Sequence, residues 1–273
     1  MPRELDVAID LARRAGDAIL KVRSGEFVVE DKGAGEGPVT IADRQADALI
    51  RAGLEAAFPS DALLSEEHPD DLARLGQDRV WIVDPLDGTR QFVQRGTEFA
   101  VLIGLAVAGR ATVGVVHLPC DEVTYAAADG IGAFEIDAAG RRRRITLAPA
   151  PPHADELTVV VSREHYSRRT RRAVDLLRPT QLIASGSVGR KAALIAAGHA
   201  DVYVTMGGRS RHWDACASEV VVREAGGAFR DARGGELVYN TEMTHNACGL
   251  LACRAALLNR TVAAVEAALA EFS

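Results

Sequence analysis

Two amphipathic helices are predicted at the start of the chain. Between residues 3 and 23, apolar side chains recur every three or four positions, which is the spacing of one helical face. A second run of this kind begins at Thr40 and continues to Phe58, and Pro59 ends it. The charged, glycine-rich residues 31–37 lie between the two runs, and we expect them to form a mobile loop.

After Pro59 the pattern changes to short apolar runs, which indicate strands. The runs at residues 62–64 and 80–83 have the length and composition of short buried strands. Four further runs pair as two hairpins and cover residues 99–107 with 111–118, and 122–127 with 132–136. Two helices followed by a meander of this kind are typical of an α+β arrangement.

In the second half of the chain, predicted strands and helices alternate, which is typical of an α/β fold. The strands are expected at residues 157–161, 181–184, 200–204 and 249–252, and the helices at 168–177, 188–197, 214–225 and 255–272. A proline-rich segment at residues 148–152 separates the two halves. We therefore expect a chain of the α/β class, with an α+β subdomain over residues 1–148 and an α/β subdomain over residues 149–273.

The composition is that of a globular protein with a large core. The 273 residues are 48% apolar, enough for one large domain or two smaller ones that share an interface. No stretch offers about 18 uninterrupted apolar residues, so we expect no membrane partner. The first residues enter a charged helical pattern with no apolar signal core, from which we expect a cytoplasmic location.

The net charge of −6 argues against a nucleic-acid polymer as partner, because such partners normally require a basic face. The run of four arginines at residues 141–144 is a local exception, which we interpret as the solvated start of a strand after a turn. The sequence leaves both a monomer and a homodimer open.

The four cysteines give no sign of a disulfide or a zinc site. They lie in apolar surroundings and form no CxxC pair, and they are Cys120, Cys216, Cys248 and Cys253. We expect buried free thiols at these positions.

The candidate chemistry lies in acidic residues at the ends of predicted elements. The run Asp84–Thr89, with the sequence DPLDGT, directly follows the buried residues 80–83, which places its two carboxylates at the edge of a sheet. Carboxylate and carbonyl oxygens there are ligands for hard cations such as Mg2+, and free N–H groups after Gly88 would favour a phosphate. An ordinary exit from a strand into a turn uses the same residue types, so this run alone leaves both interpretations open.

Three further acidic sites favour the metal interpretation when taken together with that run. Glu66 and Glu67 end another predicted strand, where adjacent acids repel each other unless a cation or solvent neutralises them. Asp43 also suits a capping box with Thr40, and Asp214 also suits a helix N-cap. Each local alternative is reasonable by itself, but four acidic sites at the edges of elements are harder to explain separately.

In their order along the chain, these motifs resemble those of the inositol monophosphatase superfamily, in particular its lithium-sensitive, metal-dependent phosphatases. The resemblance extends from about Leu5 to Leu251. The matching motifs are PVTIAD at 38–43, SEE at 65–67, WIVDPLDGT at 81–89, and WD at 213–214 followed by EAGG at 224–227. The resemblance implies a layered αβαβα fold, an active site between two subdomains, and two or three Mg2+ ions as cofactors.

The resemblance also implies roles for individual residues. The ligands would be Glu66, Asp84 and the Leu86 carbonyl for a first metal, and Asp84, Asp87 and Asp214 for a second. Glu66 would also help to hold a third, weaker ion, with Glu67 supporting it. Asp43 and Thr89 would orient the attacking water. Because activated water attacks directly, no covalent intermediate is needed, and we assign no role to the cysteines or to the seven histidines.

Members of the superfamily differ in the residues that are expected to contact the substrate. Inositol monophosphatases usually carry a glutamate where this chain has Thr205, which weakens the inositol interpretation. Residues 185–191, SGSVGRK, are similar to the serine-then-lysine pattern of the 3'(2'),5'-bisphosphate nucleotidases. A substrate with a second phosphate requires a cation away from the metals, and Lys191, Arg209 and Arg211 are candidates. The alternative to a substrate contact is an exposed position on a helix for Lys191, and a solvated loop for Arg209 and Arg211.

The expected function is hydrolysis of adenosine 3',5'-bisphosphate to AMP and phosphate, which the resemblance places in sulfate assimilation. The residues expected to contact this small phosphorylated substrate are Gly88, Thr89, Ser187, Lys191 and Arg211. Phosphatases for inositol 1-phosphate, fructose 1,6-bisphosphate or histidinol phosphate are alternatives. A non-catalytic binding protein is a further alternative, although the intact acidic set speaks against it.

Overall fold

The structure is a computed structural model that describes residues 1–33, 37–150 and 156–272. The two helices predicted at the start of the chain are α1 (Arg3–Arg23) and α2 (Ile41–Ala57). Between them lies a two-stranded ribbon of β1 (Val29–Asp31) and β2 (Pro38–Thr40), which the sequence pattern did not reveal. Residues 34–36 of the predicted loop lie outside the described residues.

The first sheet has seven strands in chain order, of which the first two are parallel and the others antiparallel. The strands are β3 (Ala62–Ser65), β4 (Arg79–Asp87), β5 (Ala100–Val107), β6 (Arg110–Leu118), β7 (Val123–Ala128), β8 (Gly132–Ile136) and β9 (Arg142–Ile145). Every predicted run of the meander matches one of them to within one residue at its start or end. The arginine run is the start of β9, as predicted, and its first three residues are exposed.

The second sheet has five strands in the order β11-β10-β12-β14-β13. The strands are β10 (Thr158–Ser162), β11 (Gln181–Ser185), β12 (Val202–Thr205), β13 (Gly227–Asp231) and β14 (Leu250–Arg254). The helices of this half are α4 (Arg168–Leu177), α5 (Val188–Ala196), α6 (His212–Glu224) and α7 (Leu258–Glu271). The predicted elements are all present, and β13 is an additional strand because the chain turns at Gly226 directly into it.

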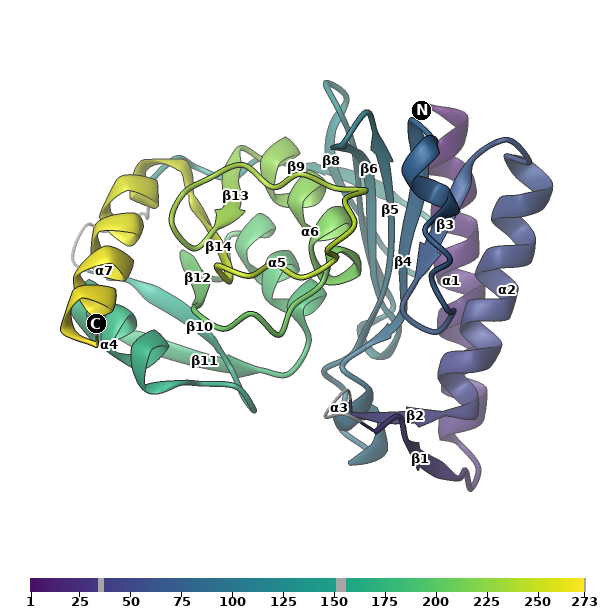
Figure 1. Ribbon diagram of the computed structural model, residues 1–273, viewed down its shortest axis with the longest axis horizontal. Helices are drawn as coiled ribbons and strands as arrows, with labels where there is room; N and C mark the ends of the chain where they lie inside the picture. Colours follow the sequence, from purple (N-terminus) through teal and green to yellow (C-terminus); the bar gives the residue numbers. More distant parts are fainter. Residues whose placement is uncertain (34–36, 151–155, 273) are drawn as a thin grey trace.

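The elements stack in five layers, as Figure 1 shows. Helices α1 and α2 cover one face of the seven-stranded sheet, and α5 and α6 fill the space between the two sheets. Helices α4 and α7 cover the outer face of the five-stranded sheet. The predicted layered αβαβα arrangement is therefore confirmed. Residues 151–155 of the proline-rich segment lie outside the described residues, and the subdomain boundary at residue 148 stays a prediction.

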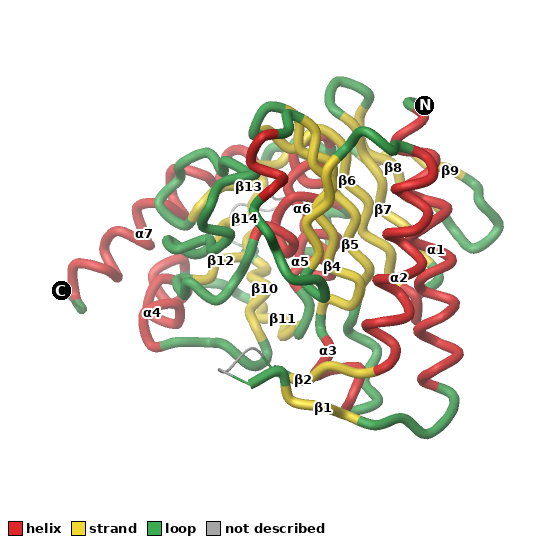
Figure 2. The backbone as a smooth tube through the Cα atoms, turned by 45° about the vertical axis from the view of Figure 1, so that its right-hand side comes forward, coloured by secondary structure: helices red, strands yellow, loops and turns green. Residues whose placement is uncertain are grey.

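A pair of glycines brings α6 close to the middle of the large sheet. Gly104 of β5 and Gly114 of β6 are register partners, so they lie side by side on the sheet. A Cβ at Gly114 would overlap the Ala217 carbonyl oxygen, and one at Gly104 would lie 2.7 Å from Cys216 Sγ. The absence of side chains at both positions lets the backbone of α6 approach this surface. Figure 2 shows α6 and α5 against these central strands.

The cysteines agree with the prediction except at one position. Cys216 and Cys253 are buried, Cys120 is half-buried, and all four are free thiols. Cys248 is exposed, so the expectation that it would be buried was wrong. It lies in the loop before β14, where the backbone turns at Gly249 with a φ of 86°. Among the described helices, none is both long and apolar enough to cross a membrane.

Candidate active site

A β-bulge at the end of β4 turns two carboxylates toward the same side. Asp84 pairs with Leu102 of β5 and Asp87 pairs with Ala100, so two residues of β4 stand opposite one residue of its partner. In a regular strand, residues three apart point to opposite faces, and the extra residue of a bulge removes this alternation. Asp84 Oδ1 accepts a hydrogen bond from the Leu86 N–H at 3.0 Å, which fixes the turn.

Asp214 joins these two residues from the other half of the chain. Carboxylate oxygens of Asp84, Asp87 and Asp214 all lie within 4.8 Å of one another. The two residues of β4 are buried and Asp214 is half-buried. Burial raises the pKa of Asp84 well above its usual range, and the negative charges of nearby acids, first Glu66 and then Asp87, raise it further. The pKa of Asp214 is raised by burial and by Asp87.

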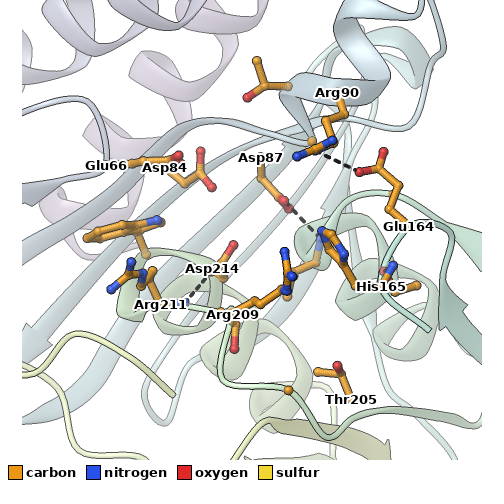
Figure 3. A pocket seen from close by; sticks show the side chains of 18 of the residues that line it. Glu66, Asp84, Asp87, Arg90, Glu164, His165, Thr205, Arg209, Arg211 and Asp214 are labelled. Atoms are coloured by element: carbon orange, nitrogen blue, oxygen red, sulfur yellow. Dashed lines mark hydrogen bonds and ion pairs between the residues drawn. The ribbon is translucent and has the colours of Figure 1, made fainter. Parts of the chain in front are cut away.

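Three carboxylates at this distance repel one another unless positive charge lies between them. Oxygen donors gathered at one point are the ligand set that Mg2+ and Ca2+ prefer. The donor set therefore fits a divalent cation, and the cation would remove the repulsion that raises these pKa values. Figure 3 shows the three side chains pointing into one cavity from opposite walls.

Asp87 is fixed by the first turn of α5, which comes from the second half of the chain. Its Oδ2 accepts hydrogen bonds from Ser187 Oγ at 2.5 Å and from the Gly189 N–H at 2.6 Å. The Val188 N–H donates to Oδ1 at 3.2 Å. A carboxylate is stabilised there because the free N–H groups and the positive end of the helix dipole face it. Ser187 is thus buried behind Asp87, where the sequence had predicted a contact with substrate.

Asp214 is oriented by the start of its own helix. The Arg211 N–H donates to Asp214 Oδ2 at 2.6 Å, and α6 begins at His212, so the N-cap is Arg211 and the interpretation of Asp214 as N-cap was wrong: Asp214 caps the helix from its third position. The buried Asn246 side chain holds the same turn, because its Nδ2 donates to the Arg211 carbonyl at 2.7 Å. The capping role and the place in the carboxylate cluster are therefore compatible.

Glu66 lies at the edge of the cavity and is paired with Lys32, which directly follows β1. Lys32 Nζ lies 2.8 Å from Glu66 Oε1 and 2.5 Å from Glu67 Oε1. Burial raises the pKa of Glu67 to about 7, and its hydrogen bond with Lys32 opposes the rise. Burial acts to lower the pKa of Lys32, but the charges and hydrogen bonds of Glu66 and Glu67 together outweigh it, so the pKa is raised and the ammonium stays protonated. Lys32 therefore neutralises part of the acidic charge beside the cluster.

Asp43 and Thr89 form a hydrogen-bonded pair at one side of the site. Asp43 Oδ2 accepts from the Thr40 N–H at 2.8 Å and from Thr40 Oγ1 at 2.7 Å, which is the predicted capping box. Its other oxygen, Oδ1, lies 3.0 Å from Thr89 Oγ1, and the Leu86 carbonyl lies 3.1 Å from that hydroxyl. Burial raises the pKa of Asp43, against the hydrogen bonds from Thr40. The pair brings together residues that the sequence places far apart.

The cluster opens into a cavity of about 790 Å3 between the two halves of the chain. Lys191 lines it but is fully buried, so the interpretation as an exposed helix lysine was wrong. Its Nζ lies 3.3 Å from the Ser185 carbonyl and 5.2 Å from the centre of the Tyr203 ring. Burial lowers the pKa of Lys191 to about 8, while the charge of Asp87 opposes the fall.

Other cations surround the cavity at greater exposure. Arg209 is exposed, and Arg211 is half-buried with its Nη1 2.7 Å from His245 Nδ1. Arg90, Glu164 and His165 also line the cavity, and sequence reasoning did not single them out. For Arg90 a signal was available, because it directly follows the DPLDGT run at residues 84–89. Glu164 and His165 come from the segment after β10, which carries no motif.

Comparisons with known proteins agree with this geometry. Residues 2–269 match the sequence profile described as the inositol monophosphatase family. The chain is 37% identical over 237 residues to the 3'(2'),5'-bisphosphate nucleotidase CysQ of Escherichia coli K12. This match covers 86% of this chain and 93% of that protein. It is 32% identical over 273 residues to the histidinol-phosphatase of Chlorobaculum parvum, with 97% of each chain covered.

Solved structures show the same fold. A Thermotoga maritima IMPase superposes with a TM-score of 0.83 at 27% identity and covers 99% of both chains. CysQ from Bacteroides thetaiotaomicron, described as a bacterial member of the inositol monophosphatase family, superposes with a TM-score of 0.79 at 32% identity. The match covers 92% of this chain and 97% of that one.

Proposed function

Because the chain belongs to the inositol monophosphatase family and is a phosphatase, we propose that it hydrolyses adenosine 3',5'-bisphosphate to AMP and phosphate with Mg2+. The observation that carries the proposal is the distribution of charge in one cavity. Asp84, Asp87 and Asp214 form an acidic cluster, and the cations Lys191, Arg209 and Arg211 line the same cavity. A substrate with a second phosphate would use cations in addition to the cluster, and the relative in E. coli is a nucleotidase for such a substrate.

The carboxylates provide the metal ligands in this proposal. When bound, divalent cations activate water and stabilise the charge on both the attacking and leaving oxygens of the phosphate. Asp84, Asp87 and Asp214 would hold these ions, and Glu66 and the Leu86 carbonyl face the same cavity. Two or three Mg2+ ions are expected from such a set.

The pair of Asp43 and Thr89 would orient the attacking water. If the Thr89 hydroxyl donates its proton to Asp43 Oδ1, its lone pairs are free to accept a hydrogen bond from that water. Thr40 holds Asp43 through its other oxygen, and if the Leu86 carbonyl serves as a metal ligand, Asp43 Oδ1 is the acceptor left for the Thr89 proton. The pair therefore positions a water on one side of the phosphate, and neither residue forms a covalent bond to the phosphate.

The substrate contacts follow from the same cavity. Gly88 and Thr89 lie next to the cluster and would meet the phosphate that is cleaved. Lys191 and Arg211 would meet the rest of the nucleotide. Ser187 would act indirectly, since its hydroxyl holds Asp87. Sulfate assimilation, a cytoplasmic location and sensitivity to lithium stay predictions that accompany this substrate.

A panel of phosphate esters tests the proposal. Phosphate release is measured with and without Mg2+ from adenosine 3',5'-bisphosphate, inositol 1-phosphate, fructose 1,6-bisphosphate and histidinol phosphate. The expected result is a kcat/KM for the nucleotide at least about tenfold above the others. A preference for inositol phosphate or histidinol phosphate would contradict the proposed substrate, but it would still agree with metal-dependent hydrolysis of a phosphate ester. Release from none of them would favour a non-catalytic binding protein.

A further inference from the structure

An ion pair between Arg90 and Glu164 joins the two walls of the cavity. Arg90 belongs to the short helix α3 (Thr89–Val93), and Glu164 lies in the segment after β10, in the other half of the chain. Arg90 Nε lies 3.3 Å from Glu164 Oε2, and both side chains line the cavity. Figure 3 shows the pair close to Asp87, with a dashed line between the Arg90 guanidinium and the Glu164 carboxylate.

Glu164 is held in place independently of Arg90. Gln91 Nε2 donates to Glu164 Oε1 at 3.0 Å. The preceding residue, Arg163, makes a two-bond contact with Glu98 at 2.8 and 2.7 Å, which anchors the segment to the region after α3. Glu164 is therefore a fixed anion whose position does not depend on the guanidinium.

Arg90 keeps donors for a further partner. Within residues 1–33, 37–150 and 156–272, its terminal nitrogens donate no hydrogen bond, and its side chain is 50% exposed at the cavity. A guanidinium presents a planar set of donors that matches the oxygens of a phosphate. Its acidic partner is Glu164 and not a member of the metal-binding cluster, so Arg90 is not needed to balance the charge of that cluster.

From these contacts we infer that Arg90 binds the phosphate of the substrate that is not hydrolysed. This inference rests on the proposed function, because it requires a substrate with two anionic groups. The cleaved phosphate must lie at the carboxylate cluster and its metals. Arg90 offers the second phosphate a partly solvated cation at the cavity wall, while Lys191 offers a buried one. Glu164 positions the guanidinium before the substrate arrives.

The test uses Arg90→Gln in the Mg2+-loaded protein, with kcat/KM measured for adenosine 3',5'-bisphosphate and for a small monophosphate. The expected loss is about tenfold on the bisphosphate, through KM, and less than about twofold on the monophosphate. Calorimetry supplies a readout without turnover. AMP keeps the phosphate that is not cleaved, so its binding should weaken by a similar factor, whereas inorganic phosphate should bind as in the wild type.

Arg172→Gln is the matched control. Arg172 of α4 also pairs with a glutamate, Glu271, and its side chain is 40% exposed against 50% for Arg90, but it does not line the cavity. Loss of such an ion pair alone should change both substrates equally and by a small factor. Arg90→Lys should recover part of the loss on the bisphosphate, because it restores the charge without the planar donors.

Two other results of Arg90→Gln would overturn the inference. Equal losses of Arg90→Gln on both substrates would place Arg90 at the cleaved phosphate or in a structural role, and no loss would leave it a surface arginine. A wild type that prefers a different bisphosphate contradicts the proposed nucleotide substrate, and the same ratio is then measured with that bisphosphate. If the wild type hydrolyses only monophosphates, its substrate has no second phosphate, and the proposed role of Arg90 is overturned as well.

Discussion

At the scale of single residues, two of the three clustered acids combine a structural hydrogen bond with a free oxygen. Asp84 accepts from the Leu86 N–H with one oxygen, and Asp214 accepts from the Arg211 N–H with one of its own. In each case the second oxygen remains for the cavity. This arrangement fixes the carboxylates before any ion arrives, which lowers the conformational entropy lost on binding.

Replacing Asp84 by asparagine separates function from stability. An amide cannot supply the charge needed by two cations, so turnover with Mg2+ should be nearly abolished. In the metal-free protein the same change removes a buried charge that Glu66, Asp87 and Asp214 repel. The free energy of unfolding in EDTA should therefore rise, on the order of 1 kcal/mol. Phosphate release and urea unfolding measure the two effects, and normal Mg2+-dependent activity in this variant would refute the ligand assignment.

A buried histidine away from the site predicts a loss of stability in acid. His117 of β6 is buried, with Nδ1 3.0 Å from Thr124 Oγ1, and burial lowers its pKa to about 4. The unfolded chain protonates this ring near pH 6.5, so between pH 6.5 and 4 the unfolded state binds more protons than the folded one. Stability should fall as the pH falls through this window, by about 2 kcal/mol between pH 7 and 5.

Urea unfolding of the wild type and of His117→Gln at pH 7 and pH 5 checks this prediction. Glutamine does not titrate, so the variant should lack this part of the pH dependence even though it is less stable at both pH values. If the two proteins lose the same free energy of unfolding between pH 7 and pH 5, His117 is not the group responsible.

At the scale of elements, helix α6 connects the fold to the site. Its first turn carries Asp214, and its middle lies against the paired glycines of β5 and β6. Because the helix is fixed at its middle, the position of its first turn depends on how closely the backbone can approach the sheet. Residues far from the cavity therefore set the position of Asp214.

Gly114→Ala tests this dependence. The new methyl group would overlap the Ala217 carbonyl, so α6 must move away from the sheet. Overpacking of this kind costs typically about 1–3 kcal/mol, and the displaced Asp214 should also weaken Mg2+ binding. Thermal unfolding and calorimetric titration with Mg2+ measure the two effects. Gly76→Ala serves as the control, because a Cβ at Gly76 has no described atom within 4 Å. Wild-type Mg2+ affinity in Gly114→Ala would show that Asp214 does not depend on this packing.

At the scale of the whole molecule, the sequence predicted the layers and the acids but not the contacts between distant segments. Hydrophobic spacing was sufficient for the long helices and the buried strands. It was not sufficient for β1, whose three residues are exposed, and the ribbon therefore escaped prediction. The place of Lys191 could not be predicted either, because a single lysine in a helical pattern carries no sign of burial. Arg90 and Glu164 meet through the tertiary fold alone.

The site itself was predictable as far as its residues lie in motifs. The sequence placed Asp84 and Asp87 directly after a strand of residues 80–83, whereas β4 continues through Asp87, so both lie at the end of the strand and not beyond it. That Asp214 comes within 4.8 Å of them depends on α6 lying across the first sheet, which no local pattern shows. The resemblance to a known family supplied this step, and the geometry now gives its physical reason.

The most direct test of the central claim, a divalent metal centre built on three carboxylates, is the metal dependence of phosphate release. Purified protein is stripped with EDTA, and hydrolysis of adenosine 3',5'-bisphosphate is followed as Mg2+ is returned. The metal-free protein should release no phosphate above background, and saturating Mg2+ should restore turnover and raise the midpoint of thermal unfolding together. Equal phosphate release with and without divalent ions would contradict the claim.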